Sequence, residues 1–253
     1  MRLGDFTDLA KMYVHRVGYS DVILKALYEH LECNLEGTIV ADVGAGTGKL
    51  TEGLISLGLK GYAIEPNQAM REEGVRLIGN GSFRWLTGTA ESTSLPDKSV
   101  NWILMGSSFH WTEPEVALKE FHRVLTPGGA FTAIWNPRDL EACPLQQEIQ
   151  ALIQAQIPNF TRVSSGAKEY TKDIEKKLAY GGYFATPLFM EASHSVKMSK
   201  ERYLNAWRSV NDIRTQAGEE LFEKILESIC ERLKDVDTLD VPYKTRAWTV
   251  KAK

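Results

Sequence analysis

A glycine-rich turn at residues 44–48 is the feature that most constrains the fold of this chain. A short β-branched run, Thr38–Val43, leads through Gly44-Ala45-Gly46-Thr47-Gly48 into a helical pattern, Lys49–Leu57. Glycine is required where the backbone takes a positive φ and where a ligand approaches without interference from a Cβ atom. Free N–H groups at the start of the next helix then bind a carboxylate or a phosphate. The turn therefore indicates a ligand-binding loop.

Two common glycine loops do not fit this spacing. A P-loop needs a glycine separated by four residues from Gly-Lys-[Ser/Thr], but Val43 occupies the first position and Leu50 the last. A dinucleotide fingerprint reads Gly-x-Gly-x-x-Gly, and counted from Gly44 its sixth position is Lys49. The loop therefore belongs to another ligand class.

The sequence around the loop alternates strand and helix patterns. Such alternation indicates βαβ units, which build a doubly wound parallel sheet with helices on both faces. Ligands bind such sheets beyond the carboxyl ends of the strands. We expect helices over Val22–Leu31, Lys49–Leu57, Gln68–Leu77 and Glu115–Leu125, and strands over Thr38–Val43, Gly61–Ile64, Phe83–Leu86, Trp102–Met105 and Ala130–Trp135.

The pattern changes after Pro137. We expect helices over Cys143–Ile157, Lys200–Val210 and Glu219–Leu233, strands over Ser195–Met198 and Lys244–Lys251, and a polar loop over Asn159–Gly166. We interpret this part as a helical cap with closing strands.

Composition excludes several classes of protein. The 253 residues fit one domain or a domain with an insertion, and 43% apolar with 25% charged residues excludes intrinsic disorder. The net charge of −3 argues against a nucleic-acid partner. The three cysteines are far apart, which disfavours a zinc site or a disulfide framework. No signal peptide and no apolar run of roughly 18 residues is present, so we expect a soluble, cytoplasmic protein with no membrane partner.

The loop and its acidic partners resemble a known family. Asp42 together with Gly44, Gly46 and Gly48 resembles motif I of class I S-adenosylmethionine-dependent methyltransferases. Glu65 ends the second expected strand, 21 residues after Gly44, where the family has an acidic residue. A carboxylate there accepts hydrogen bonds from both ribose hydroxyls.

Later segments resemble the type 11 small-molecule subgroup of that family. They are Thr87–Glu91 after the third strand, Leu95–Trp102 before the fourth and Phe121–Gly129 before the fifth. The resemblance implies a Rossmann-like α/β fold, with a doubly wound, mostly parallel, seven-stranded sheet. It also implies a single domain over 1–253, a cofactor-binding core over 38–136, and a mostly helical substrate-binding cap over 138–235 that the N-terminal helix completes.

The cofactor implied is S-adenosylmethionine, with S-adenosylhomocysteine as its product. Carried over to this sequence, the family's cofactor-binding positions are Tyr13, Asp42, Gly44, Ala45, Gly46, Glu65, Pro66, Thr89, Ala90, Glu91 and Ser107. We expect no metal, because Ser107 and Ser108 stand where magnesium-dependent relatives have an Asp. The Asn-Pro-Pro-Tyr motif of enzymes that methylate adenine or glutamine amides is absent after the fourth strand, where Gly106–Trp111 stands.

The acceptor is therefore expected to be a small-molecule metabolite, methylated on O or N by in-line displacement. His110 follows the fourth strand and is the candidate general base; the alternative is a histidine that only shapes the loop. The candidate substrate-binding residues are Tyr19, Trp111, Trp135, Tyr203, Trp207 and Arg208. Ordinary packing of the aromatic side chains and a surface charge at Arg208 are equally compatible with the sequence, and Arg138 carries the same ambiguity.

Two other functions stay open at this point. One is a tRNA-modifying methyltransferase, which needs a basic surface. The other is a non-catalytic, cofactor-binding scaffold, because a fold does not imply an activity. The sequence carries no expectation for the oligomeric state.

Overall fold

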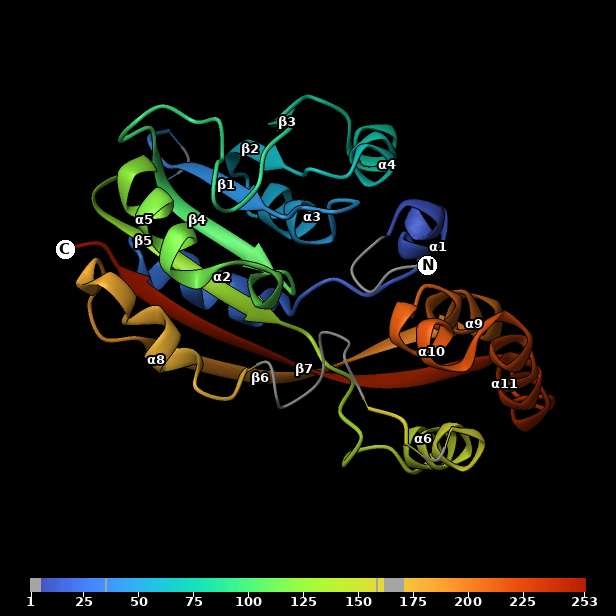
Figure 1. Ribbon diagram of the computed structural model, residues 1–253. Coiled ribbons are helices and arrows are strands. Elements are labelled where there is room, and N and C mark those ends of the chain that lie inside the picture. Colours follow the sequence, from blue (N-terminus) through green and yellow to red (C-terminus); the bar gives the residue numbers. More distant parts are fainter. Residues whose placement is uncertain (1–5, 35, 158, 162–170) are drawn as a thin grey trace.

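Seven strands form one mixed sheet in the order β3-β2-β1-β4-β5-β7-β6 (Figure 1). The computed structural model describes residues 6–34, 36–157, 159–161 and 171–253. Only β7 runs antiparallel to its neighbours. The predicted doubly wound, mostly parallel sheet is confirmed. The strands are β1 (Ile39–Val43), β2 (Lys60–Ile64), β3 (Phe83–Leu86), β4 (Val100–Gly106), β5 (Leu125–Trp135), β6 (Leu188–Ser199) and β7 (Thr238–Lys251).

Helices cover both faces of the sheet. On one face α2 (Asp21–His30), α3 (Lys49–Ser56) and α4 (Gln68–Ile78) pack against side chains such as Val40 and Leu104. On the other face α5 (Pro114–Val124) and α8 (Ile174–Leu178) pack against Ile103 and Phe131. The central strands are nearly continuous apolar runs because both of their faces are buried. The predicted helices of the first half are present, each within a few residues of its expected bounds.

The last two strands of the sheet form a long antiparallel pair. β6 and β7 pair from Leu188↔Thr249 to Ser199↔Thr238, whereas β5 pairs only with Arg246–Lys251. The distal half of this pair therefore extends past β5. There it supports a second hydrophobic core, in which Leu239 and Val241 meet four helices. These cap helices are α6 (Pro144–Gln156), α9 (Lys200–Arg208), α10 (Asn211–Ala217) and α11 (Glu219–Arg232).

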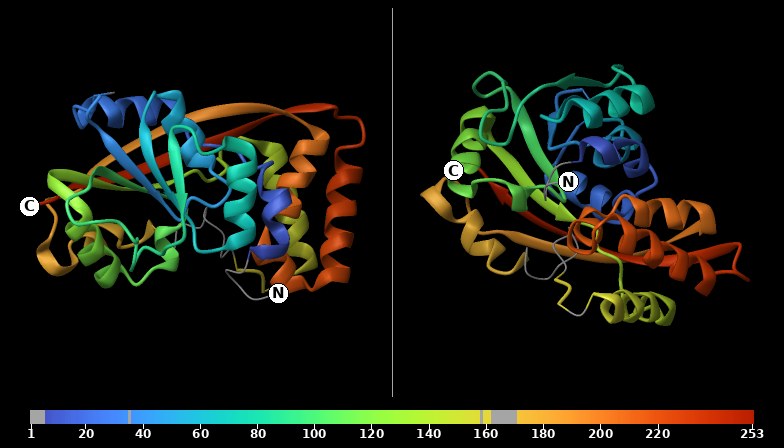
Figure 2. Two further views of the ribbon diagram at one scale, coloured as in Figure 1. Left: turned by 90° about the horizontal axis from the view of Figure 1, so that it is seen from above. Right: turned by 45° about the vertical axis from the view of Figure 1, so that its right-hand side comes forward.

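The N-terminal segment lies between the two parts. A short 3₁₀ helix, η1 (Thr7–Leu9), runs into α1 (Ala10–Tyr13), which contacts both α4 and α9. Figure 2 shows α4, α1 and the cap helices side by side. The segment thus joins the sheet core to the cap.

The C-terminal part differs from the sequence expectation in several elements. β6 and β7 are much longer than Ser195–Met198 and Lys244–Lys251, because their pairing with each other extends both strands. The short helices α8 and α10 were not expected, since each is too short to show a helical period. Residues 138–235 contain β6 and α8 as well as the cap helices. Most of the expected loop Asn159–Gly166 lies outside the described residues.

None of the helices in the described part of the chain combines the length and the apolar character needed to cross a bilayer.

Candidate functional site

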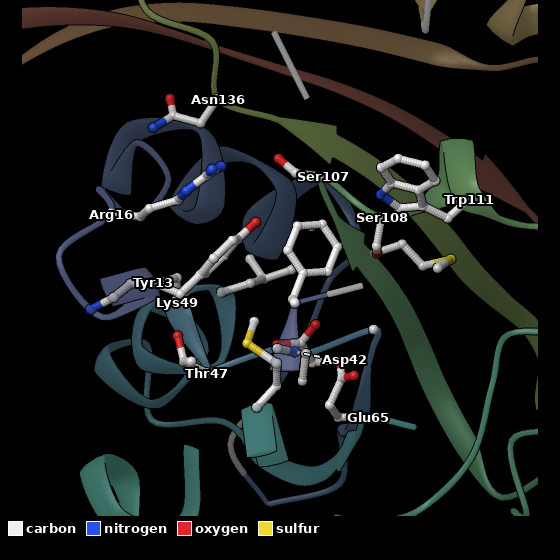
Figure 3. Close-up of a pocket in the computed structure, with 18 of the residues that line it drawn as sticks. Tyr13, Arg16, Asp42, Thr47, Lys49, Glu65, Ser107, Ser108, Trp111 and Asn136 are labelled. Carbon is white, nitrogen blue, oxygen red and sulfur yellow. Dashed lines mark hydrogen bonds between the residues drawn. The ribbon is translucent and has the colours of Figure 1, made fainter. Parts of the chain in front are cut away.

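A cavity of about 590 Å³ opens at the carboxyl ends of β1, β2 and β4. Its lining comes from these strand ends, from the N-terminal segment, from residues 136–140 after β5, from the end of α9 and from Tyr243 of β7. Figure 3 shows Asp42 and Glu65 on one side and Arg16 and Asn136 on the other. The cavity therefore has two halves, one formed by the glycine loop and its neighbours and the other facing the cap.

The glycine loop takes the backbone conformation that its residues predict. Gly44, Gly46 and Gly48 have φ values of +71°, +59° and +88°. A Cβ atom on Gly44 would lie 2.7 Å from Ser108 Oγ, and one on Gly48 would lie 2.1 Å from Ile78 Cδ1. The N–H groups of Gly44 and Ala45 both donate to the carbonyl oxygen of Ile64 at the end of β2, over 2.8 and 3.1 Å. The loop is thus fixed against the neighbouring strand.

Glu65 lies at the end of β2 with its carboxylate at the edge of the cavity. Its Oε2 accepts from the Gly46 N–H at 2.8 Å, and its Oε1 accepts from the Asn67 N–H at 2.8 Å. Burial raises the pKa of Glu65, and the two backbone hydrogen bonds oppose that effect. Each carboxylate oxygen retains acceptor capacity beyond its one hydrogen bond. The side chain is therefore oriented to accept a diol from the cavity side.

Asp42, on β1, is the second buried carboxylate of this half. Its Oδ2 accepts from Thr51 Oγ1 at 2.6 Å, while its buried Oδ1 has no hydrogen-bond partner among the described residues. Burial raises the pKa of Asp42 to about 7, and the nearby Glu65 charge adds to this effect. A buried carboxylate with one unpartnered oxygen beside a cavity favours a cationic ligand group.

The end of β4 brings Gly106, Ser107 and Ser108 to the middle of the cavity. Ser107 has a φ of +56° and donates its N–H to Ile134 O at 2.7 Å. Tyr19 Oη donates to Ser107 Oγ at 3.1 Å. A Cβ on Gly106 would lie 2.5 Å from Tyr19 Oη, so glycine permits this approach. Burial raises the pKa of Tyr19, which keeps its hydroxyl neutral and able to donate.

Aromatic rings from the N-terminal segment border the cavity. The Phe6 ring lies edge-on to Tyr13 and Trp111, with centroids 5.6 and 6.3 Å apart. The Arg16 guanidinium lies 4.2 Å from the centre of the Tyr13 ring and donates to Ser209 Oγ at 2.8 Å. These contacts tie the N-terminal segment to the loop after β4 and to the end of α9.

The residues after β5 form the wall that faces the cap. Asn136 Nδ2 donates to Gly18 O at 2.7 Å, and its Oδ1 accepts from Thr245 Oγ1 at 2.7 Å. Arg138 and Tyr243, which form an isolated antiparallel bridge, also line the cavity. Sequence reasoning did not select Arg16 or Asn136. Asn136 follows directly after the fifth expected strand, and that position was the one signal that pointed to it.

The structure brings most of the predicted ligand-binding residues together. All eleven predicted cofactor residues line the cavity: Tyr13, Asp42, Gly44, Ala45, Gly46, Glu65, Pro66, Thr89, Ala90, Glu91 and Ser107. Of the predicted substrate residues, Tyr19 and Trp111 also line it. Contact with a ligand stays a prediction for each of them.

His110 is not among the residues that line the cavity, and its role as a general base stays a prediction. It lies in η2 (Phe109–Trp111), a single 3₁₀ turn that directs Trp111 to the cavity and His110 back toward the sheet core. Trp135 Nε1 lies 3.4 Å from His110 Nδ1, and burial lowers the pKa of His110 to about 4. The alternative of a histidine that shapes its loop fits this position.

Four predicted substrate residues also lie outside the lining. Trp135 is buried in the sheet core, and Tyr203 and Trp207 are buried in the cap core. Arg208 Nη1 donates to Asn205 Oδ1 on its own helix at 2.8 Å. Tyr203 and Trp207 do share a face of α9, as their i, i+4 spacing predicts. That face packs inside the cap core and does not line the cavity.

The described residues contain no group of three or more His, Cys, Asp or Glu side chains arranged to hold a metal ion. The absence of a metal requirement stays a prediction.

Comparison with known proteins points to one family. A family model for a methyltransferase domain of type 11 matches residues 41–133. An uncharacterized methyltransferase of Mycobacterium tuberculosis is 42% identical over 100 residues, and the match spans 40% of each chain. An uncharacterized methyltransferase of Schizosaccharomyces pombe is 28% identical over 255 residues, which cover 96% of this chain and 94% of the relative.

Solved structures share the fold over nearly the whole chain. A candidate type II methyltransferase from Anaeromyxobacter dehalogenans superimposes with a TM-score of 0.64 at 19% identity, covering 92% of this chain and 97% of its own. A candidate methyltransferase of an antibiotic biosynthesis pathway from Anabaena variabilis gives a TM-score of 0.56 at 20% identity, covering 92% and 98%. At these identities the likeness concerns the fold.

Proposed function

The chain carries a class I methyltransferase domain of the type 11 family over residues 41–133, and from this premise we propose that it transfers a methyl group from S-adenosylmethionine to an O or N atom of a small-molecule metabolite. The observation that carries the proposal is the pair of buried carboxylates, Asp42 and Glu65, beside the fixed glycine loop in one cavity.

The cofactor half of the cavity offers groups that match each part of S-adenosylmethionine. Glu65 accepts the ribose hydroxyls, and the unpartnered Oδ1 of Asp42 balances the cationic amine of the amino-acid part. Thr89, Ala90 and Glu91 border the region that adenine would occupy. When bound, the cofactor would supply a methyl group on a positively charged sulfonium sulfur. The product that leaves after transfer would be the neutral thioether S-adenosylhomocysteine.

The protein's own contribution is orientation and the exclusion of water. Alignment of two reactants lowers a barrier by about 7–11 kcal/mol in well-oriented systems. Tyr19 and Ser107, hydrogen-bonded to each other at the end of β4, form a neutral polar group between the two halves. No histidine stands among the described residues that line the cavity. The titratable side chains of the lining include the carboxyl groups of Asp42, Glu65 and Glu91.

A two-step experiment tests the proposal. Calorimetry with S-adenosylhomocysteine measures cofactor binding, and transfer of a tritiated methyl group from S-adenosylmethionine to a metabolite extract measures activity. We expect binding in the micromolar range and label in small molecules. The variant Glu65→Ala should lose the binding, while Glu220→Ala, at an exposed position of α11, should retain it.

The outcomes separate the competing functions. Absence of binding at millimolar S-adenosylhomocysteine contradicts the proposal. Binding without transfer to any acceptor indicates a non-catalytic scaffold, and label that appears only in added tRNA indicates an RNA substrate.

A further inference from the structure

Arg138 is a cation with no counter-charge among the described residues. It lines the half of the cavity that faces the cap, which we call the acceptor half, and it is partly buried. Its Nε is fully buried and has no hydrogen-bond partner in the part of the chain that the structure describes. No ion pair joins its guanidinium to any residue that the structure describes. A buried guanidinium N–H without an acceptor is costly, so such a group is expected to have a partner when the protein functions.

The backbone on both sides of Arg138 is fixed. Lys244 N–H donates to Pro137 O at 2.9 Å, and Asp139 N–H donates to Pro242 O at 2.9 Å. These two bonds enclose Arg138 in a short continuation of the antiparallel pairing between β5 and β7. The residue is therefore held as firmly as a strand residue, although it lies beyond the end of β5.

The side chain is fixed as well. The Arg138 guanidinium carbon lies 4.1 Å from the centre of the Trp207 ring and 5.4 Å from that of Tyr203. Tyr203 Oη in turn accepts from Gln146 Nε2 at 2.8 Å. Stacking on an aromatic face orients a guanidinium and leaves its in-plane N–H groups directed outward.

The other two cations of the lining are already engaged. Arg16 donates through Nε to Ser209 Oγ and through Nη2 to Ser209 O. Lys49 Nζ forms an ion pair with Glu52 at 3.0 Å. Asp139, the carboxylate next to Arg138 in sequence, lies 3.5 Å from Lys244 Nζ. Arg16 thus has neutral hydrogen-bond acceptors and Lys49 an ion pair, whereas Nε of Arg138 has no acceptor among the described residues.

We propose that the methyl acceptor carries a carboxylate that pairs with Arg138 and thereby anchors the acceptor in the cavity. The inference rests on the proposed function and adds the chemical class of the acceptor. A planar guanidinium fork matches a carboxylate in a bidentate pair.

The test compares matched acids and amides on three proteins. The proteins are the wild type, Arg138→Gln and a control, Arg84→Gln, which removes the same charge from an exposed position on β3. The ligands are benzoate and succinate, their uncharged amides, and inorganic phosphate. Each is titrated by calorimetry with and without saturating S-adenosylhomocysteine, so that cofactor binding is read separately.

We expect the wild type and Arg84→Gln to bind at least one of the acids about 10- to 100-fold more tightly than its amide, in line with a charge-assisted hydrogen bond. Arg138→Gln should lose this preference and still bind S-adenosylhomocysteine. Arg138→Lys should recover only part of the preference, because an ammonium retains the charge but not the fork. This partial recovery separates carboxylate binding from a purely structural role in the stacking on Trp207.

Several results would overturn the inference. They are equal binding of acids and amides by the wild type, an unchanged preference in Arg138→Gln, no binding of either acid, or tighter binding of phosphate than of both acids. A carboxylate preference in a wild type that does not bind S-adenosylhomocysteine would support the anion site and contradict the proposed function.

Discussion

The two halves of the cavity are built in different ways. The cofactor half uses residues 42–48, 65–70, 89–91 and 106–108, which lie at the ends of neighbouring parallel strands or just beyond them. The acceptor half combines the N-terminal segment, residues 136–140, the end of α9 and Tyr243 of β7. The first half is therefore fixed by the sheet itself, whereas the second exists only when the cap is packed against it.

The halves also differ in charge. Asp42, Glu65 and Glu91 line the cofactor half, while Arg16 and Arg138 line the acceptor half. This separation suits a cationic cofactor opposite an anionic acceptor, because each ligand then meets the opposite charge. Substitutions in the cap should therefore lower the free energy of unfolding and weaken acceptor binding. Substitutions at the strand ends should weaken cofactor binding.

The largest expected effect comes from the core of the cap. Trp207→Ala should lower the free energy of unfolding by about 3–5 kcal/mol, because the removed ring is fully buried and leaves a cavity. Trp111→Ala should change it by less than about 1 kcal/mol, because that ring is 43% exposed. Urea denaturation of both variants measures the difference. Equal losses would show that the cap is not an independent source of stability.

Asp42→Asn tests the electrostatics of the cofactor half. Burial raises the pKa of Asp42 to about 7, above its unfolded value of 3.8, so the folded state binds more protons between these values. The contribution of Asp42 to stability is therefore complete below pH 4 and is lost as pH rises through 7. Glu65 acts in the same direction, and His110, whose pKa is lowered to about 4, acts in the opposite direction.

The difference between wild type and Asp42→Asn isolates the Asp42 contribution. Urea denaturation at pH 5 and pH 8 should show the variant gaining stability relative to the wild type as pH rises, by a few kcal/mol. A pH-independent difference would mean that the carboxyl group is ionised in the folded protein over the whole range. The same variant should bind S-adenosylhomocysteine more weakly at pH 8, because the charge opposite the amine is gone.

Gly44→Ala tests the rigidity of the glycine loop. A Cβ at this position would lie 2.7 Å from Ser108 Oγ, so either the loop or Ser108 must shift. The positive φ of Gly44 adds backbone strain to any other residue. We expect affinity for S-adenosylhomocysteine to fall about 10- to 100-fold, equivalent to roughly 1.4–2.8 kcal/mol. Gly128→Ala is the matched control, because its φ of +75° carries the same strain and no atom lies within 4 Å of the added Cβ. Equal affinities for the two variants would contradict a rigid loop.

The cofactor half could be predicted from the sequence because its residues lie close together along the chain. Asp42 and the three glycines are close in sequence, and Glu65 lies one β-α-β unit further on, so strand order alone brings these residues together. Tyr13 and Tyr19 were identified through the family resemblance rather than through any pattern in the chain. Both line the cavity, and their contact with a ligand stays a prediction.

The acceptor half was predicted poorly because its geometry depends on packing between distant segments. The spacing of Tyr203 and Trp207 marks a shared helix face but does not specify which surface that face meets. His110 and Trp111 are adjacent, and only the direction of a single 3₁₀ turn decides which of them borders the cavity. Arg138 obtains its orientation from rings about 65–70 residues later in the chain.

Arg208→Gln should have the smallest effect and tests the boundary between the two regions. From the sequence, Arg208 is a candidate clamp for a substrate or an ordinary surface charge; in the structure it donates to Asn205 on α9 and is not among the residues that line the cavity. Its replacement should change the free energy of unfolding by no more than about 1 kcal/mol, because it removes one hydrogen bond within α9 from a half-buried side chain. Binding of benzoate or succinate, measured by the same calorimetry as for Arg138→Gln, should match the wild type. A loss of acid binding comparable to that of Arg138→Gln would mean that the acceptor half extends along α9, and that its positive charge is shared by two arginines rather than held by one.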